Sequence, residues 1–242
     1  RVIAVSQTAK QYLLDHCDVP PESIRVIYRG TDPVEFPRGY QPSDTWLASW
    51  HADFPQLQGK RIIALPGRLS RLKGHHHLVT LIRQLKARGI TDVAGIIVGG
   101  IDPQHDSYVS KLKASIDEAG LHDEIVFTDH RTDMREIYAI STLVLAVSNK
   151  AESFGRTALE PLSIGTPTVG FDLGGVGEIL AALFPSGRVP NQDSQALVDT
   201  VAGLLTAPMP PIAPNTEFLL SSMCEHTLQT YAELVSQEET QQ

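Results

Sequence analysis

From Arg61 onward, short apolar runs alternate with stretches of helical periodicity, and this alternation constrains the fold more than any other feature of the 242 residues. The strand-like runs are Ile62–Leu65, Ala94–Val98, Ile125–Thr128, Leu143–Val147 and Thr168–Phe171, with a short sixth near Arg188-Val189. The helical patterns lie near Gly74–Arg88, Tyr108–Glu118, Met134–Ile140, Gly155–Ile164, Val176–Leu183 and Ser194–Leu205. Continuously apolar strands that alternate with helices are typical of a parallel sheet covered on both faces. The sequence therefore predicts an α/β fold that binds ligands at the carboxyl ends of its strands, at a switch in strand order.

The first thirty residues predict a small βαβ-like unit. Strand-like runs at Val2–Val5 and Ile24–Tyr28 flank a helix that Ser6 caps and that runs through about Cys17. Two short strands cannot bury their own faces. Because the chain also opens with Arg rather than Met, we expect this unit to be the remnant of an N-terminal domain of a longer protein.

Two further segments flank the main pattern. Four prolines interrupt the stretch before Arg61, which predicts a linker with one short helix at Asp44–Phe54. Trp46 and Trp50 share a face of that helix, and we expect this face to dock by core packing. A second proline-rich break precedes a closing helix at Thr216–Val235. The predicted units are residues 1–30, the linker 31–60, the main domain 61–214 and the closing helix with its tail, 215–242.

Composition limits the classes of partner. The net charge of −8 argues against a general nucleic-acid surface, because binding to a phosphate backbone needs a basic face. The two cysteines form no disulfide framework and suit the reducing cytosol. No apolar run approaches the roughly eighteen residues of a membrane span, and no signal peptide is evident. We therefore expect a cytoplasmic protein with no nucleic acid among its partners.

His75-His76-His77 resembles a metal site in composition only. Adjacent residues of a helix point about 100° apart, so three such imidazoles cannot comfortably share one ion. We expect them to have surface or helix-capping roles. The sequence contains no pattern of a Ser–His–Asp triad or of a zinc cluster, and we expect neither a metal nor another cofactor.

The stretch from Ser148 to Gly170 predicts the chemistry. It reads as the end of a buried strand, a loop, a helix, a glycine stop and the next strand. Gly155 lets the backbone approach a ligand, and the helix start after it offers unpaired N–H groups and a positive dipole, most often to phosphate. Glu160 lies about a turn and a half inside this helix, where an acid suits ribose hydroxyls. Glu152 precedes the helix, where a group joined to the phosphate would lie.

Two cations are predicted at the same edge of the sheet. Arg68 follows the first strand of the sheet, and Lys73 lies where the next helix begins. Arginine grips phosphate oxygens with two hydrogen bonds, whereas lysine acts as a mobile point charge. Any one of these four charged residues alone is more simply a solvated surface group. Together they predict a diphosphate site formed by both cations and the helix start at Gly155.

These motifs resemble those of retaining glycosyltransferases of the GT-B fold, in the large GT4-like family. The resemblance rests on Gly67-Arg68-Leu69 with Lys73-Gly74, on Val98-Gly99-Gly100, on Glu152 and Glu160 with seven residues between them, and on Val2–Ser6, Ile27–Asp32, Phe36 and Met223–Leu234. It covers essentially the whole chain, and it is closest to bacterial cell-surface polysaccharide and lipopolysaccharide transferases. It implies that the main domain is the Rossmann-like, nucleotide-sugar-binding C-terminal half of a GT-B fold.

The resemblance also implies roles for individual residues. Arg68 and Lys73 would contact the donor diphosphate and stabilise charge on the leaving group. Glu160 would bind the ribose, and Glu152 would lie near the donor sugar, where it either orients the sugar or assists at the anomeric carbon. The other implied substrate-binding residues are Gly99, Ser153, Phe154, Gly155, Arg156 and Thr157, together with His130 and Arg131 in a loop bordering the nucleobase.

Three positions depart from the family pattern. The family often has glycine where Asp129 stands, so base contacts differ or are lost there. Arg29-Gly30 replaces the more usual Asn-Gly in the linker. Pro161 follows Glu160 inside the helix, where it removes one backbone hydrogen bond and predicts a local bend.

The implied function is metal-independent transfer of a sugar, with retention, from a UDP-, GDP- or ADP-linked donor to a hydroxyl of a glycan or lipid-linked acceptor. We expect this in cell-surface polysaccharide or lipopolysaccharide synthesis, at the inner face of the membrane. Because the acceptor domain is mostly missing, the chain alone is expected to bind donor weakly and to transfer little. Two alternatives stay open: a sugar-nucleotide epimerase of related fold, and a non-catalytic module that binds nucleotide sugars.

Overall fold

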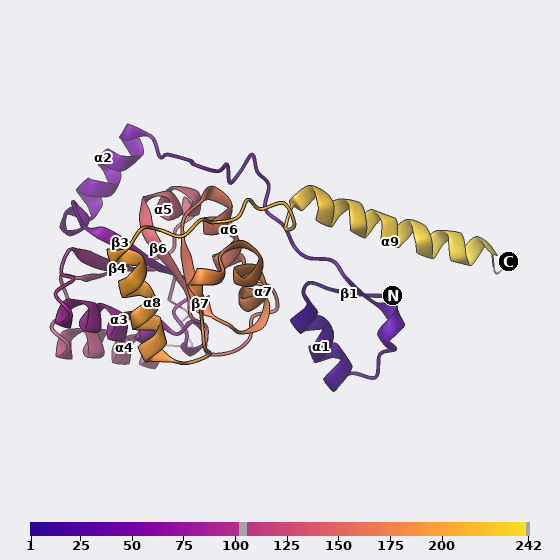
Figure 1. The fold of residues 1–242 in the computed structure, drawn as a ribbon, viewed down its shortest axis with the longest axis horizontal. Coiled ribbons are helices and arrows are strands. Elements are labelled where there is room, and N and C mark those ends of the chain that lie inside the picture. Colours follow the sequence, from indigo (N-terminus) through magenta and orange to yellow (C-terminus); the bar gives the residue numbers. More distant parts are fainter. Residues whose placement is uncertain (102–105, 241–242) are drawn as a thin grey trace.

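The computed structural model describes residues 1–101 and 106–240 (Figure 1). Its main domain is a six-stranded parallel sheet in the order β5-β4-β3-β6-β7-β8. The strands are β3 (Arg61–Pro66), β4 (Val93–Val98), β5 (Ile125–Phe127), β6 (Ser141–Ala146), β7 (Thr168–Phe171) and β8 (Arg188–Val189). The helices are α3 (His75–Ala87), α4 (Asp106–Glu118), α5 (Met134–Ile140), α6 (Arg156–Ile164), α7 (Gly174–Leu183) and α8 (Ser194–Thr206). The α/β fold and the order of elements predicted from the apolar periodicity are confirmed.

Alternate residues of each central strand face opposite sides of the sheet. In β3, Ile63 and Leu65 belong to the larger core cluster, whereas Ile62 and Ala64 belong to a second cluster on the other face. Helices α3, α4 and α8 contribute to the first cluster, and α5 contributes to the second. Both faces are thus covered, as parallel strands with continuous apolar sequence require. The strand order reverses between β3 and β6, which is the predicted switch point.

The proline-interrupted segment before β3 packs on the second face of the sheet. Its helix α2 (Asp44–Asp53) begins at Ser43, whose side chain accepts a hydrogen bond from the backbone N–H of Trp46. Trp46 and Trp50 stack with ring centroids 5.2 Å apart, and Trp50 is buried. The predicted docking of this tryptophan face is confirmed. Short 3-10 turns occur at Pro21–Ser23, Pro55–Leu57, Arg71–Lys73 and Pro185–Gly187.

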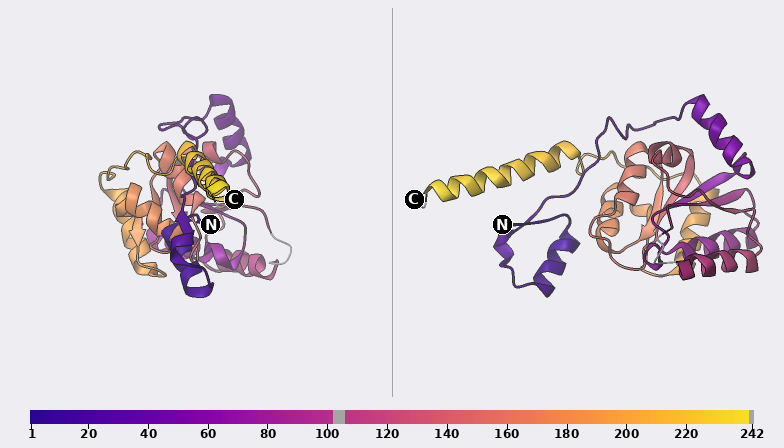
Figure 2. Two further views of the ribbon diagram at one scale, coloured as in Figure 1. Left: turned by 90° about the vertical axis from the view of Figure 1, so that its right-hand side faces the viewer. Right: turned by 180° about the vertical axis from the view of Figure 1, so that it is seen from behind.

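The two ends of the chain lie together beyond the main domain (Figures 1 and 2). Strands β1 (Val2–Ala4) and β2 (Ile24–Val26) pair in parallel across helix α1 (Gln7–His16), as predicted. The terminal helix α9 (Leu220–Thr240) is joined to this unit through Arg25, which bonds to Thr230 and Glu233 of α9. None of the helices in the described ranges is long and apolar enough to cross a membrane.

The segment that leads from the N-terminal unit into the main domain meets the segment that leads out to α9 at Thr31. Its backbone N–H donates to the carbonyl of Phe218, and its carbonyl accepts from Leu220, both at 3.0 Å. A Cβ atom on the neighbouring Gly30 would lie only 2.1 Å from the carbonyl carbon of Leu219. A residue without a side chain is therefore required at Gly30, because the two backbones touch there.

Glu178 of α7 connects the main domain to the N-terminal unit. Its carboxylate accepts hydrogen bonds from the backbone N–H of Gln7 (3.0 Å) and Thr8 (2.7 Å), and from the hydroxyls of Thr8 (2.6 Å) and Tyr28 (2.9 Å). The first two donors are orphan groups of the α1 N-terminus, where a negative charge is favoured. Burial opposes ionisation, but these hydrogen bonds outweigh it and lower the pKa of Glu178. One carboxylate thus fixes α1 against α7.

We expect Glu178→Ala to loosen the N-terminal unit and leave the main domain intact. Loss of even one hydrogen bond to a charged group changes a local opening equilibrium by about 10-fold or more. Hydrogen exchange should therefore accelerate by at least about that factor in α1, with no change in the strands β3 and β6. Glu118→Ala, at an exposed site in α4, is the control. Unchanged exchange in α1 would show that Glu178 does not hold the unit.

Candidate functional site

The loops after β3, β4 and β5 are joined by backbone hydrogen bonds at the carboxyl edge of the sheet. The N–H of Gly67 donates to Val98 (2.9 Å), and the N–H of Gly99 donates to Asp129 (3.0 Å). The backbones of the first two loops touch: a Cβ atom on Gly99 would lie only 2.0 Å from the carbonyl oxygen of Gly67. The motif glycines are therefore needed for packing between loops, which fixes the backbone around Arg68.

A second set of contacts brings Lys73 to Glu152. The backbone N–H of Asn149, in the loop after β6, donates to the carbonyl of Leu72 at 2.8 Å. A Cβ atom on Gly74 would lie 2.1 Å from the carbonyl oxygen of Val147, so the start of α3 presses on the end of β6. Lys73 Nζ consequently lies 2.8 Å from Glu152 Oε1, although the two residues are 79 positions apart. Ser148 Oγ also donates to that oxygen.

Arg68 lies on the same edge and is exposed. Within residues 1–101 and 106–240, no ion pair or side-chain hydrogen bond engages its guanidinium. The structure thus brings Arg68, Lys73, Gly99 and Glu152 to neighbouring loops at the switch point.

Helix α6 begins at this edge with no side-chain cap. Gly155 occupies the N-cap position with a φ of 109°, a conformation that glycine adopts without strain. A Cβ atom there would lie 2.8 Å from Val176 Cγ2. The loop before α6 packs on the start of α7, where the N–H of Gly175 donates to the carbonyl of Glu152 at 2.9 Å. The uncapped first turn leaves backbone N–H groups available to an anion.

Glu160 lies one and a half turns inside α6 and is only 6% exposed. Its Oε1 accepts from Arg156 Nε (2.8 Å) and Nη2 (2.7 Å), and its Oε2 accepts from the Tyr138 hydroxyl (3.0 Å). Burial, followed by the nearby Glu160 charge, raises the pKa of Tyr138 well above its usual value. Helix α6 continues through Pro161, and the bend expected there stays a prediction.

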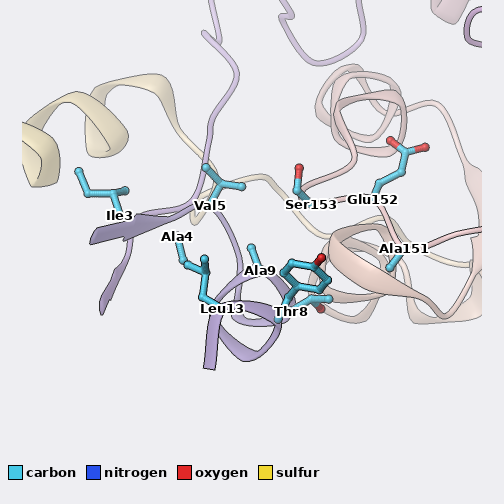
Figure 3. A pocket seen from close by; sticks show the side chains of 10 residues that line it. Ile3, Ala4, Val5, Thr8, Ala9, Leu13, Ala151, Glu152 and Ser153 are labelled. Carbon is cyan, nitrogen blue, oxygen red and sulfur yellow. The ribbon is translucent and has the colours of Figure 1, made fainter. Parts of the chain in front are cut away.

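Two cavities adjoin these residues. The first, about 300 Å³, lies between the N-terminal unit and the loop of Glu152 and Ser153 (Figure 3). Most of the side chains that β1 and α1 contribute to its lining are apolar, whereas the loop contributes Glu152 and Ser153. The second, about 340 Å³, is lined by Arg156 and Glu160 together with residues of α5 and of the segment around Phe36. One cavity thus adjoins Glu152, and the other adjoins Glu160.

The loop expected to border the nucleobase divides into two parts. His130 is exposed and close to Gly100, next to the loop of Arg68. The guanidinium of Arg131 instead bonds to Asp133 at 2.9 and 2.6 Å and lies over the ring of Trp50. The structure thus places Arg131 in the contact between α2 and the start of α5. Asp129 has a φ of 56°, the left-handed conformation that glycine adopts most readily.

The expected surface or capping roles are wrong for two of the three consecutive histidines. His75 and His77 are buried on different sides of α3, His75 beside the ring of Tyr108 in α4 and His77 against the ring of Phe171 in β7. His75 Nδ1 lies 3.3 Å from the Tyr108 hydroxyl, and His77 Nε2 lies 3.1 Å from Asn149 Oδ1. Among the described residues, no group of three or more His, Cys, Asp or Glu side chains is arranged to hold a metal ion.

Three contacts were missed in the sequence, two in the site and one that joins α7 to α1. Tyr138 reads as a core residue of α5, Ser148 as a strand end, and Glu178 as an ordinary helix acid. Each acts through a partner distant in sequence or across a loop, and so local periodicity gives no signal. A tyrosine on the buried face of a helix was the one available hint, because a buried hydroxyl needs a hydrogen-bond partner.

Residues 48–214 match the family "Glycosyl transferases group 1", and residues 1–35 match "Glycosyltransferase Family 4". Because the first match covers more than half of the chain, the protein belongs to the glycosyl transferase group 1 family. The sheet and its covering helices are accordingly the Rossmann-like half of a GT-B fold.

The relatives include lipopolysaccharide core mannosyltransferases. The chain is 29% identical over 157 residues to LpcC of Rhizobium leguminosarum bv. viciae, covering 65% of this chain and 44% of that protein. It is 28% identical over 207 residues to LpsB of Rhizobium meliloti, covering 84% and 55%. The chain thus spans about half the length of these curated relatives.

Solved structures show the same fold. The chain superposes on Anabaena Alr3699/HepE, solved with UDP and glucose, with a TM-score of 0.85 and 23% identity, over 96% of this chain and 63% of that one. The C-terminal domain of LpcC from Francisella tularensis superposes with a TM-score of 0.61 and 20% identity, over 84% and 98%.

We expect Gly155→Ala to destabilise the chain by roughly 1–3 kcal/mol, since it forces a side chain into a left-handed conformation against Val176. Gly203→Ala is the matched control. A Cβ atom on Gly203 in α8 meets nothing within 4 Å, so that substitution should stabilise by about 0.5–1 kcal/mol. Urea unfolding measures both. Equal effects of the two substitutions would contradict the strained start of α6.

Burial lowers the pKa of His75 to about 4 in the folded chain. Below about pH 6.5 the unfolded chain binds a proton that the folded chain does not, so stability should fall as the pH drops from about 6.5 toward 4. The loss due to His75 at pH 5 should be about 2 kcal/mol. His75→Gln should therefore show a shallower fall in free energy of unfolding between pH 7.5 and 5. His122→Gln, at an exposed site, should keep the original slope; an unaltered slope in both variants would refute a buried neutral His75.

Proposed function

We propose that this chain is the donor-binding half of a retaining glycosyltransferase that uses a nucleotide-diphosphate sugar. The observation that carries the proposal is the meeting of Arg68, Lys73 and the uncapped start of α6 at the switch point, with Glu160 inside the same helix. Two cations and a helix N-terminus suit a diphosphate, and a buried carboxylate beyond them suits a ribose.

The donor would lie across this edge from base to sugar. His130 would border the base, and the backbone amides from Ser153 to Thr157 would meet the diphosphate. Glu152 lies at the boundary of the first cavity, where the sugar would extend toward α1. Because Lys73 and Glu152 are in contact, the diphosphate end of the donor and its sugar end would lie next to each other.

In this proposal the bond between the anomeric carbon and the diphosphate breaks while an acceptor hydroxyl attacks the same face of the sugar. Negative charge grows on the leaving diphosphate, where Arg68, Lys73 and the amides of α6 stabilise it. The acceptor proton passes to a phosphate oxygen. The chemistry uses only the side chains and amides named, and no metal.

The relatives narrow the substrates. HepE was solved with UDP and glucose, which makes UDP the first nucleotide to test. LpcC and LpsB are named as lipopolysaccharide core mannosyltransferases, which supports a lipid-linked or glycan acceptor. We propose that this acceptor lies at the inner face of the membrane. The chain covers about half of these proteins, so residues 1–30 would continue into an acceptor domain, without which it would transfer little.

We expect UDP, GDP or ADP to bind this chain in isothermal titration calorimetry, and Arg68→Ala and Glu160→Ala to weaken that binding by at least about 10-fold each. A charge-assisted hydrogen bond of about 1.5–3 kcal/mol supports this size. Arg83→Ala and Glu118→Ala, at exposed sites of α3 and α4, are matched controls. Binding should persist in EDTA. Failure of all three nucleotides to bind, or equal affinity in every variant, would refute the site.

A further inference from the structure

The two oxygens of Glu160 are held in different ways. Oε2 accepts from Tyr138, and both residues are almost fully buried, at 6% and 1% exposed. Oε1 accepts from Arg156, whose side chain is 66% exposed. The carboxylate is therefore fixed from the protein interior on one oxygen and covered from the solvent side on the other.

Tyr138 is a rigid donor. Its ring packs in the second core cluster, and its carbonyl accepts from Thr166 Oγ1 at 2.8 Å. Because burial and the adjacent carboxylate raise its pKa well above the usual value, the hydroxyl keeps its proton and donates to Glu160. A buried carboxylate oxygen left without a donor is costly, so the bond selects one orientation of Glu160.

Arg156 is a displaceable partner. Its side chain lies mostly in solvent, whereas that of Glu160 is only 8% exposed, so the guanidinium can turn into water when a ligand hydroxyl takes its place on Oε1. Arg156 and Glu160 both line the cavity of about 340 Å³ beside α5. Oε1 is therefore the oxygen that a ligand in this cavity reaches once the guanidinium moves.

We propose that Tyr138 is the positioning residue of the ribose site: its hydroxyl holds Oε2 of Glu160, so that Oε1 alone accepts a ribose hydroxyl after Arg156 moves aside. This inference rests on the proposed function, and it adds a residue outside the motifs that define the site. It assigns Tyr138 to recognition of the sugar of the nucleotide and not of its diphosphate.

The test compares a ribonucleoside diphosphate, the best binder among UDP, GDP and ADP, with its 2′,3′-dideoxy analogue. Tyr138→Phe should weaken binding of the ribonucleotide by about 10-fold and change binding of the dideoxy analogue by less than about 2-fold, because only the first offers a hydroxyl to Glu160. Tyr40→Phe is the matched control, since it removes a 2.7 Å tyrosine–glutamate bond to Glu136 on α5 without touching Glu160.

The outcomes separate the two levels of inference. If the unsubstituted chain binds no nucleotide, the proposed function and this inference both fail. If it binds but does not prefer the ribonucleotide to the dideoxy analogue, Glu160 does not read the ribose, and this inference fails while the diphosphate site stands. Equal weakening of both ligands by Tyr138→Phe, or no weakening of either, overturns the role of Tyr138 alone.

A second comparison keeps the proposal testable if the single variant Tyr138→Phe does not fold. The double variant Tyr138→Phe/Glu160→Gln leaves no buried charge without its donor, and it is compared with Glu160→Gln. Because Tyr138 acts through the carboxylate, the two should discriminate equally between the ribonucleotide and its dideoxy analogue. A further loss of discrimination in the double variant would overturn the proposal.

Discussion

The close contact of backbones at the carboxyl edge of the sheet is the constraint on which the rest of the site depends. The reversal of strand order brings the ends of β3 and β6 side by side. Gly99 lies against Gly67, and Gly74 lies against Val147, at distances that no Cβ atom could occupy. The contact between these backbones fixes the positions of the loops. Side chains on neighbouring loops, such as Lys73 and Glu152, therefore lie within bonding distance.

The elements of the main domain could be predicted because their signal is local. A strand such as β4 is apolar at every position, and a helix such as α8 repeats its apolar residues every three or four positions, whatever lies around them. The edge of the sheet at which Arg68 and Glu152 lie also follows, because the carboxyl ends of parallel strands share one edge. Local sequence and one topological rule thus suffice for the fold and for the place of the site.

The contacts within the site could not be predicted in the same way. Lys73 and Glu152 meet through a loop-to-loop contact of Asn149, and Tyr138 meets Glu160 through the packing of α5 on α6. Such pairings depend on distances between elements in the folded chain, which the spacing of residues in the sequence does not give. The buried histidines show the same limit: their spacing showed that the side chains diverge, but not which of them are buried. By contrast, the glycine that the resemblance leads one to expect at position 129 fits the left-handed backbone that Asp129 adopts.

Two of the three cations of the site are already paired with carboxylates before any ligand is considered. Lys73 is paired with Glu152 and Arg156 with Glu160, while Arg68 has no ion-pair partner in the described part of the chain. On the proposed function, a diphosphate arrives next to two carboxylates that would repel it, in a chain of net charge −8. Its binding is therefore an exchange: the cations turn from carboxylate to phosphate, and the carboxylate oxygens they leave become acceptors for hydroxyls of the same donor. Because Tyr138 and Ser148 bond to Glu160 and Glu152 independently of the cations, the carboxylates would keep their places in such an exchange while the cations move.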